Sequence, residues 1–278
     1  MNVKETYVVL SNNKLMPCVG YGTWQLSEQE AYECVLKALK IGYKHIDTAF
    51  AYENEESVGK AIKDSGLDRD KLFITSKLPS HIKTYDETIE YFYKSLNNLQ
   101  LDYLDLYLIH APWPWSDIGS DHTQGNIQIW KAFIDLYNQG LIKAIGVSNF
   151  HVKDLKAIIE ATNFIPHVNQ IRYFVGNKQD EIYQYCIDNK IAVQAYSPLA
   201  TGELVNHPLL KQLSKKYNVT IPQICLKYCL QTSATPITRS RNEERMESNL
   251  DLNFTLDDED LGYLESLKYI ATRKFMRD

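Results

Sequence analysis

Four reactive side chains stand at or just after the ends of short apolar segments: Asp47, Tyr52, Lys77 and His110. Tyrosine is a weak acid with a pKa of about 10, but a neighbouring ammonium stabilises its phenolate and lowers that pKa. Lys77 could supply the ammonium, Asp47 could pair with it, and His110 could hydrogen-bond a substrate oxygen. Together these groups could protonate a carbonyl oxygen while something else attacks the carbonyl carbon.

Each of these side chains has a structural explanation when it is taken alone. Asp47 and Lys77 could form an ordinary buried ion pair. Tyr52 could be an aromatic at the rim of a pocket, and His110 could bond a backbone carbonyl. Four such groups at consecutive strand ends favour one shared site instead, because titratable groups gathered in a cleft often mark function.

The chain alternates apolar runs with helical patterns. The apolar runs predict strands at residues 19–23, 45–47, 72–77, 104–110, 144–148, 167–171, 191–196 and 235–238. Helical patterns follow at residues 28–40, 55–65, 85–99, 127–138, 152–162, 178–189, in a segment through Leu230, and at 243–250. Eight strand-then-helix units indicate a (β/α)₈ barrel, whose active sites lie on the loops at the C-terminal ends of the strands.

Local signals support these elements. Residues 7–10 and 14–16 predict an N-terminal β-hairpin that caps the barrel bottom. Ser27 and Thr220 each precede a Glu or Gln by three positions, as in a capping box. Gly42, Gly66 and Gly140 stand where helices should end. A doubly wound nucleotide-binding sheet is the main alternative, but the G-x-G-x-x-G spacing that it requires is absent from the sequence.

Composition limits the class of protein. A chain of 278 residues with 44% hydrophobic content can form one barrel domain, residues 1–278. The net charge of −5, with no basic stripe, argues against a nucleic-acid partner. There is no apolar stretch long enough to span a membrane and no secretion signal, so we expect a cytoplasmic monomer. The five dispersed cysteines lack a C-x-x-C spacing and are expected to be reduced thiols that pack.

Longer motifs resemble those of one known family. Residues 42–49 read Gly-Tyr-Lys-His-Ile-Asp-Thr-Ala, and further motifs stand at 22–24, 74–77, 101–110, 145–150, 169–170 and 196–199. In this order they resemble the aldo-keto reductases, departing at Lys44, where arginine is usual. The resemblance covers nearly the whole chain. It implies an NADPH-dependent carbonyl reductase on a (β/α)₈ barrel, acting on a small-molecule carbonyl substrate.

The resemblance also implies a role for each matching position. Tyr52 would be the general acid, Lys77 would lower its pKa, Asp47 would anchor Lys77, and His110 would orient the carbonyl. The implied contacts to NADPH or NADP⁺ are Thr23, Trp24, Asp47, Ser148, Asn149, Gln170, Tyr196, Ser197, Leu199, Arg239, Ser240, Arg245 and Asn249. Within this set Ser148, Asn149 and Gln170 would hydrogen-bond the carboxamide of the nicotinamide, and Tyr196 would stack on the nicotinamide ring. Arginines at 239 and 245 suit a 2′-phosphate and favour NADPH over NADH.

The sequence departs from common family patterns at several positions: Ala111 for Trp, Arg172 and Phe174 after Gln170, Thr238 for Pro, Arg239 for Lys, and Ser248 for a Glu that contacts adenine. The last three bear on cofactor affinity more than on cofactor type. The run through Arg172 and Phe174 has no functional explanation from the sequence.

The long irregular stretch at residues 111–125 follows His110 and is expected to wall the site. With Tyr52 and His110, Trp24 and Trp113 are expected to line an apolar substrate pocket. The chain ends at residues 274–278, short of the C-terminal loop of many relatives, which predicts an open pocket.

Two other functional classes remain to be weighed. Because fold does not fix function, the same barrel could be an NADP-binding regulatory or structural protein with little turnover, although the intact tetrad argues against this. A metal-dependent hydrolase would need clustered ligands, and His45 and His110 are too few, so no metal is expected.

Overall fold

The computed structural model describes residues 2–268 and shows a closed barrel of eight parallel strands. The strands are β3 (Gly20–Gly22), β4 (His45–Asp47), β5 (Phe73–Leu78), β6 (Leu106–Ile109), β7 (Ile145–Ser148), β8 (Val168–Arg172), β9 (Ala192–Tyr196) and β10 (Ala234–Thr238). Each pairs with the next along the chain, and β10 closes the ring against β3. The predicted (β/α)₈ fold is therefore confirmed.

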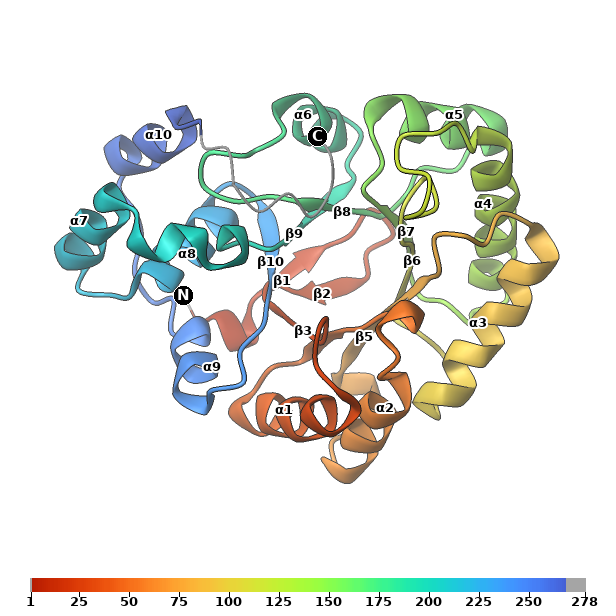
Figure 1. Cartoon of the computed structure of the whole chain (residues 1–278), viewed down its shortest axis with the longest axis horizontal. Coiled ribbons are helices and arrows are strands. Elements are labelled where there is room, and N and C mark those ends of the chain that lie inside the picture. The colour runs from red at the N-terminus through yellow and green to blue at the C-terminus, as the bar shows by residue number, and fades with distance from the viewer. Residues whose placement is uncertain (1, 269–278) are drawn as a thin grey trace.

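Helices surround the strands (Figure 1). They are α1 (Glu28–Ile41), α2 (Glu55–Asp64), α3 (Tyr85–Leu99), α4 (Thr123–Asn138), α5 (Val152–Thr162), α6 (Asp180–Asp188), α7 (Pro208–Tyr217), α8 (Ile221–Gln231), α9 (Glu243–Leu250) and α10 (Asp258–Ser266). The capping boxes predicted at Ser27 and Thr220 begin α1 and α8. Gly42 ends α1 in the left-handed conformation, with φ of 115°, where a side chain would be strained.

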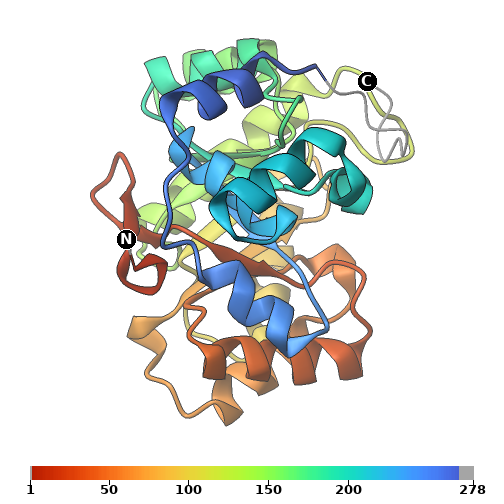
Figure 2. The same cartoon turned by 90° about the vertical axis from the view of Figure 1, so that its left-hand side faces the viewer.

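The N-terminal hairpin, β1 (Tyr7–Val9) with β2 (Leu15–Pro17), closes one end of the barrel (Figure 2). Its buried residues Leu10 and Met16 pack against Phe73, Leu106 and Val168, the first residues of their strands. The hairpin therefore caps the N-terminal ends of the strands, as predicted, and leaves the C-terminal ends open.

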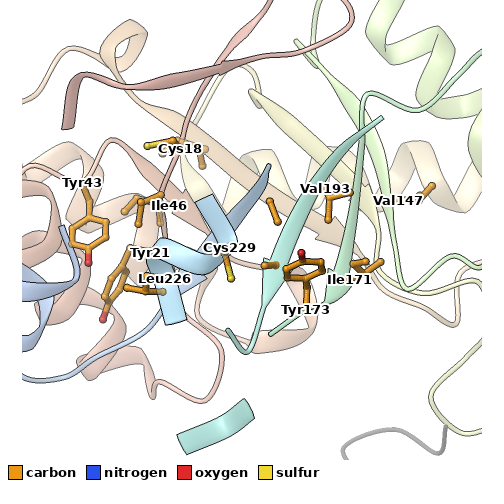
Figure 3. Close-up of a cluster of buried hydrophobic side chains, with 14 of the residues drawn as sticks. Cys18, Tyr21, Tyr43, Ile46, Val147, Ile171, Tyr173, Val193, Leu226 and Cys229 are labelled. Atoms are coloured by element: carbon orange, nitrogen blue, oxygen red, sulfur yellow. The ribbon is translucent and has the colours of Figure 1, made fainter. Parts of the chain in front are cut away.

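Strand alternation decides which side chains enter the barrel. In β5, Ile74 and Leu78 join the main core cluster, whereas Phe73 packs with the hairpin cluster inside the barrel. Successive side chains of a strand point to opposite faces, so Lys77 shares the inner face with Phe73. Figure 3 shows the outer layer, in which Ile46, Val147, Ile171 and Val193 lie among the buried core side chains.

Several element boundaries differ from the sequence prediction. Helix α4 begins at Thr123 rather than residue 127, because Asp121 accepts hydrogen bonds from the Thr123 amide at 2.9 Å and from its hydroxyl at 2.6 Å. Strand β6 is shorter than residues 104–110, and Leu104 forms only an isolated bridge to Ile142. Helices α7 and α10 were not predicted.

No helix within residues 2–268 is both long and apolar enough to cross a membrane. Over the same residues, no cluster of His, Cys, Asp and Glu is arranged to hold a metal ion.

Candidate active site

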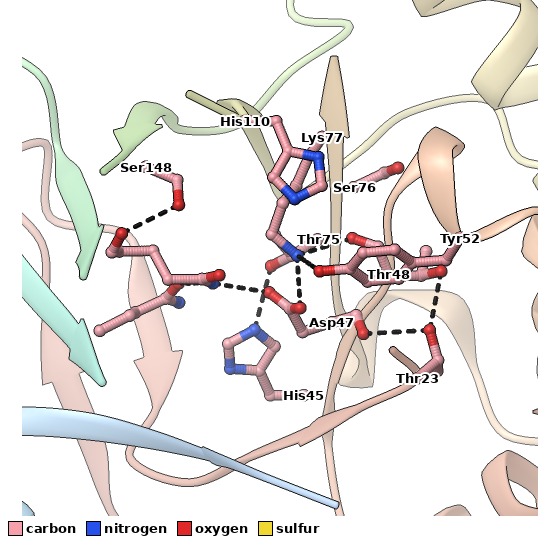
Figure 4. Close-up of polar contacts among 12 residues, drawn as sticks. Thr23, His45, Asp47, Thr48, Tyr52, Thr75, Ser76, Lys77, His110 and Ser148 are labelled. Atoms are coloured by element: carbon pink, nitrogen blue, oxygen red, sulfur yellow. Dashed lines mark hydrogen bonds and ion pairs between the residues drawn. The ribbon is translucent and has the colours of Figure 1, made fainter. Parts of the chain in front are cut away.

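The barrel brings the four reactive side chains together at the C-terminal ends of neighbouring strands (Figure 4). Asp47 is the last residue of β4, and Lys77 is the fifth residue of the six-residue β5. Tyr52 ends a short 3₁₀ turn, Phe50–Tyr52, in the loop after β4, and His110 directly follows β6. The arrangement predicted from the sequence is therefore present.

Lys77 is the centre of the cluster and is fully buried. Its Nζ donates to Asp47 Oδ1 at 2.5 Å and to the Thr48 carbonyl oxygen at 2.9 Å, and lies 3.4 Å from the Tyr52 hydroxyl. Burial disfavours the ammonium, but the charge of Asp47 and the Tyr52 oxygen outweigh it, so the pKa of Lys77 lies above its usual value. Lys77 therefore stays protonated.

Burial and the Lys77 charge act on the pKa of Tyr52 in opposite directions. Burial raises its pKa and Lys77 lowers it, and burial wins, so the pKa of Tyr52 lies above its ordinary value. Lys77 therefore acts in the direction expected from the sequence, but it offsets only part of the effect of burial, which the sequence does not reveal. The phenol consequently keeps its proton at neutral pH.

His110 is neutral over the physiological range. Burial and the Lys77 charge lower the pKa of His110 to about 3. Its ring meets Tyr52 edge to face, with centroids 5.6 Å apart, and meets Trp115 in the same way at 5.6 Å. Its Nδ1 is buried and has no hydrogen-bond partner among the described residues.

A pocket of about 630 Å³ opens above these groups. Of the predicted site residues it is lined by Trp24, Asp47, Tyr52, His110, Ser148, Asn149, Gln170, Tyr196, Ser197, Leu199, Arg239 and Asn249. The other predicted residues, Thr23, Lys77, Trp113, Ser240 and Arg245, do not line it. Thr23 is fully buried, and its hydroxyl bonds the Thr48 hydroxyl. Trp113 is buried behind Trp115, and Trp115 lines the pocket in its place.

Comparisons with known proteins show the family of this chain. A model of the aldo/keto reductase family matches residues 18–268. The chain belongs to the aldo-keto reductase family. The glyoxal reductase of Bacillus subtilis is 41% identical over 96% of this chain and 94% of its own length. The methylglyoxal reductase DkgA of Escherichia coli K12 is 37% identical, and the match covers 94% of this chain and 93% of the length of DkgA.

Solved aldo-keto reductases share the fold. The Brucella melitensis enzyme has a TM-score of 0.88 and 39% identity, with 94% of this chain and 98% of that chain covered. The Bombyx mori aldo-keto reductase, solved in complex with NADP, has a TM-score of 0.86 and 32% identity, with 94% and 92% covered. The resemblance stated from the sequence is confirmed.

In this aldo-keto reductase the polar groups on one side of the pocket hold one another in place. The Ser148 hydroxyl donates to the Gln170 carbonyl at 2.9 Å. Asn149 donates to the His110 carbonyl at 3.0 Å and accepts from the Tyr196 hydroxyl at 2.8 Å. These side chains are thus fixed in orientation by contacts that link β6, β7, β8 and β9.

Two hydrogen bonds fix the orientation of the side-chain amide of Gln170. Its Nε2 donates to Asp47 Oδ2 at 2.8 Å and to Gln194 Oε1 at 2.8 Å. A carboxylate can only accept, so the nitrogen of Gln170 must face Asp47. Both amide protons are used by the protein, which leaves the Gln170 oxygen as the group available to a ligand.

The segment after β10 lies at the rim of the pocket. Arg239 lines it and donates to the Trp24 carbonyl at 2.6 Å. Ser240 and Arg245 stand outside the lining, and Arg245 is exposed on the first turn of α9. Arg241 is tied to Glu30 of α1, with Nε to Oε1 at 2.7 Å. Ser240 is half-buried and Arg245 is exposed, and neither forms part of the pocket wall.

Arg172 lines the pocket but was not assigned to the site from the sequence. The sequence holds a signal for it, because residues 170 and 172 lie on the same face of a strand and the family resemblance assigns Gln170 to the site. The residues at 274–278, on which the prediction of an open pocket depended, lie outside the described part of the chain.

Proposed function

We propose that this protein reduces small aldehydes, and some ketones, to alcohols with NADPH. The observation that carries the proposal is the charged Lys77, which is buried and contacts both Asp47 and Tyr52, two residues that line the pocket. The relatives named as glyoxal and methylglyoxal reductases support small dicarbonyl compounds as substrates.

The residues present fit a nicotinamide dinucleotide. The free Gln170 oxygen can accept from a carboxamide N–H, and the Tyr196 ring on the pocket wall can stack on a flat heterocycle. Arg239 and the exposed Arg245 offer planar donors that suit phosphate groups. When bound, the reduced cofactor supplies the hydride that reaches the carbonyl carbon.

The chain's own residues supply the proton. Tyr52 keeps its proton at neutral pH because burial raises its pKa, so it can donate that proton to the carbonyl oxygen as negative charge develops there. The resulting phenolate is stabilised by the Lys77 ammonium, which Asp47 holds in place. The products are the alcohol and the oxidised cofactor.

His110 acts as a neutral hydrogen-bond donor. A buried N–H without an acceptor is rarer than a buried acceptor without a donor, so the orphan Nδ1 favours the tautomer with the proton on Nε2. That N–H can orient the carbonyl oxygen beside the Tyr52 hydroxyl, because His110 and Tyr52 both line the pocket.

We expect no titration of His110 in the pH profile of kcat/KM between about pH 5 and pH 8, the range where an unperturbed histidine titrates, because its pKa is lowered to about 3. The profile should be measured with an uncharged aldehyde in wild type and His110→Gln. An inflection near the ordinary histidine pKa that disappears in His110→Gln would contradict the neutral role.

The proposal is tested with purified protein, an aldehyde panel that includes glyoxal and methylglyoxal, and either NADPH or NADH. Loss of the reduced cofactor's absorbance with NADPH and an aldehyde is the expected result. Tight NADPH binding without turnover on any carbonyl would instead favour the regulatory alternative.

The cofactor preference is tested with Arg245→Gln, which is expected to weaken NADPH binding by about 10–100-fold, the value of one charge-assisted hydrogen bond, and to leave NADH binding unchanged. Arg241→Gln is the matched control: its guanidinium is tied to Glu30, so the ratio of the two affinities should stay as in wild type.

A further inference from the structure

The loop between β6 and α4, residues 110–122, is held at its base by the loop that precedes α3. Lys83 Nζ donates to the Pro112 carbonyl at 3.1 Å and lies 3.4 Å from the Ala111 carbonyl. It also donates to Asn126 Oδ1 of α4 at 2.9 Å. One ammonium therefore joins the start of the β6–α4 loop to the helix that ends it.

Further contacts connect the base of the β6–α4 loop to α4 and to the loop that precedes α3. Asn126 is buried, and its Nδ2 donates to the same Pro112 carbonyl at 2.9 Å. The Trp115 amide donates to Ser80 Oγ at 3.3 Å. A Cβ on Gly125 would lie 2.8 Å from Lys83 Cβ and 3.0 Å from the Lys83 carbonyl oxygen, so α4 packs directly on Lys83. We call Lys83, Asn126 and Ser80 the loop clasp.

The loop clasp lies at the base of the loop that carries Trp115, a residue of the pocket wall. Trp115 lines the pocket and packs edge to face on His110, whereas Ala111 and Trp113 are buried beneath it. Trp115 itself is 39% exposed, so its position depends on how the base of the loop is anchored. A shift of the base would move Trp115 relative to His110.

Burying the ammonium of Lys83 has an electrostatic cost. Burial lowers the pKa of Lys83 to about 8, and the charge of Asp154 on α5 opposes this only in part. A partly buried ammonium bonded mainly to neutral carbonyl and amide oxygens is an unusual choice for stability alone, because a buried charge is costly unless it is paired.

We propose that Lys83 is a positioning residue for the reaction, which fixes Trp115 over the pocket through the loop clasp and so determines which carbonyl compounds bind well. The inference rests on the proposed function for its kinetic consequences. The loop anchoring on which it depends can be measured without turnover.

The test compares wild type with Lys83→Met by kinetics and by hydrogen exchange of residues 110–122. For methylglyoxal, KM is expected to rise about 10-fold or more, because the loss of one hydrogen bond from a charged group has an effect of this size. The values of kcat and of the NADPH affinity are expected to change less than about threefold, which is within the scatter usual for such measurements. Amide exchange in the loop is expected to become faster. Lys83→Arg, which can keep bonds to the same carbonyls, should recover most of the substrate affinity.

The matched control is Lys143→Met, which removes another lysine that donates to a backbone carbonyl, Gly140 at 2.7 Å. It should leave KM and exchange in the loop unchanged. Asn126→Ala is a second clasp variant, and it should raise KM and loop exchange as Lys83→Met does, even if one of the two variants folds poorly.

The two proposals fail in different ways. No turnover by wild type would reject carbonyl reduction, whereas faster loop exchange in Lys83→Met would still support the anchoring. Turnover by wild type with unchanged KM and unchanged exchange in both clasp variants would overturn the role of Lys83.

Discussion

Replacing Tyr52 by phenylalanine is expected to lower kcat/KM by about 10²–10⁴-fold, the range that a positioned general acid contributes. The change removes one hydroxyl and keeps the ring that packs against His110. The pocket should therefore hold its shape, and NADPH should bind as in wild type. Steady-state kinetics with an uncharged aldehyde and fluorescence titration with NADPH measure the two quantities separately.

Tyr137→Phe is the matched control for this experiment. Tyr137 also has a phenol in a polar contact, since Asn12 of the hairpin loop donates to it at 3.4 Å, but it lies at the opposite end of the barrel from Tyr52. Its kinetics should stay as in wild type. If Tyr52→Phe kept more than about a tenth of the wild-type kcat/KM, a loss below the range expected for a general acid, the proton would have to come from another group.

Much of the fold could be predicted because the physical signals are local. The period-two pattern places Asp47 and Lys77 on the inner face of their strands, and the capping residues Ser27 and Thr220 define helix starts. Barrel closure then follows from eight strand-then-helix units, and closure alone is what brings Asp47, Tyr52, Lys77 and His110 together.

Loop geometry could not be predicted in the same way. Strand alternation stops at His110, so nothing in the sequence distinguishes Trp113 from Trp115 as the residue that faces the pocket. The choice depends on tertiary contacts of the loop clasp, such as the bond from the Trp115 amide to Ser80. For the same reason the sequence predicts a loop where the structure has the first, polar turn of α4.

The pKa of Tyr52 shows a second limit. The sequence places the Lys77 ammonium near the Tyr52 phenol, and so it predicts that Lys77 lowers the pKa of Tyr52. It does not give the extent of burial, which acts in the opposite direction and is larger. The structure thus changes the interpretation of Lys77: in the proposed mechanism it stabilises the phenolate that forms when Tyr52 gives up its proton, and burial keeps Tyr52 protonated beforehand.

Replacing Lys77 by methionine is expected to affect both stability and catalysis. The free energy of unfolding should fall by about 3–5 kcal/mol, because the change leaves the buried Asp47 carboxylate without its cation. The value of kcat/KM should fall by at least about 10²-fold, because the Tyr52 phenolate loses its stabilising charge. Urea unfolding and steady-state kinetics measure the two losses.

The control for stability is Lys14→Met. Lys14 pairs with the buried Asp105 at 3.0 Å, but Arg69 also contacts Asp105, at 2.7 Å. Since Asp105 keeps a cation, the free energy of unfolding should change by less than about 1 kcal/mol, the size of a surface ion pair. Catalysis should stay unchanged, because Lys14 follows the turn of the hairpin at the barrel bottom.

A double variant separates the two roles of Lys77. In Lys77→Met combined with Asp47→Asn, no uncompensated carboxylate remains, and the asparagine oxygen can still accept from Gln170. Most of the lost stability should therefore return, whereas kcat/KM should stay low because no ammonium faces Tyr52. Recovery of catalysis together with stability would show that Lys77 only supports the fold, and it would remove the main argument for Tyr52 as the acid.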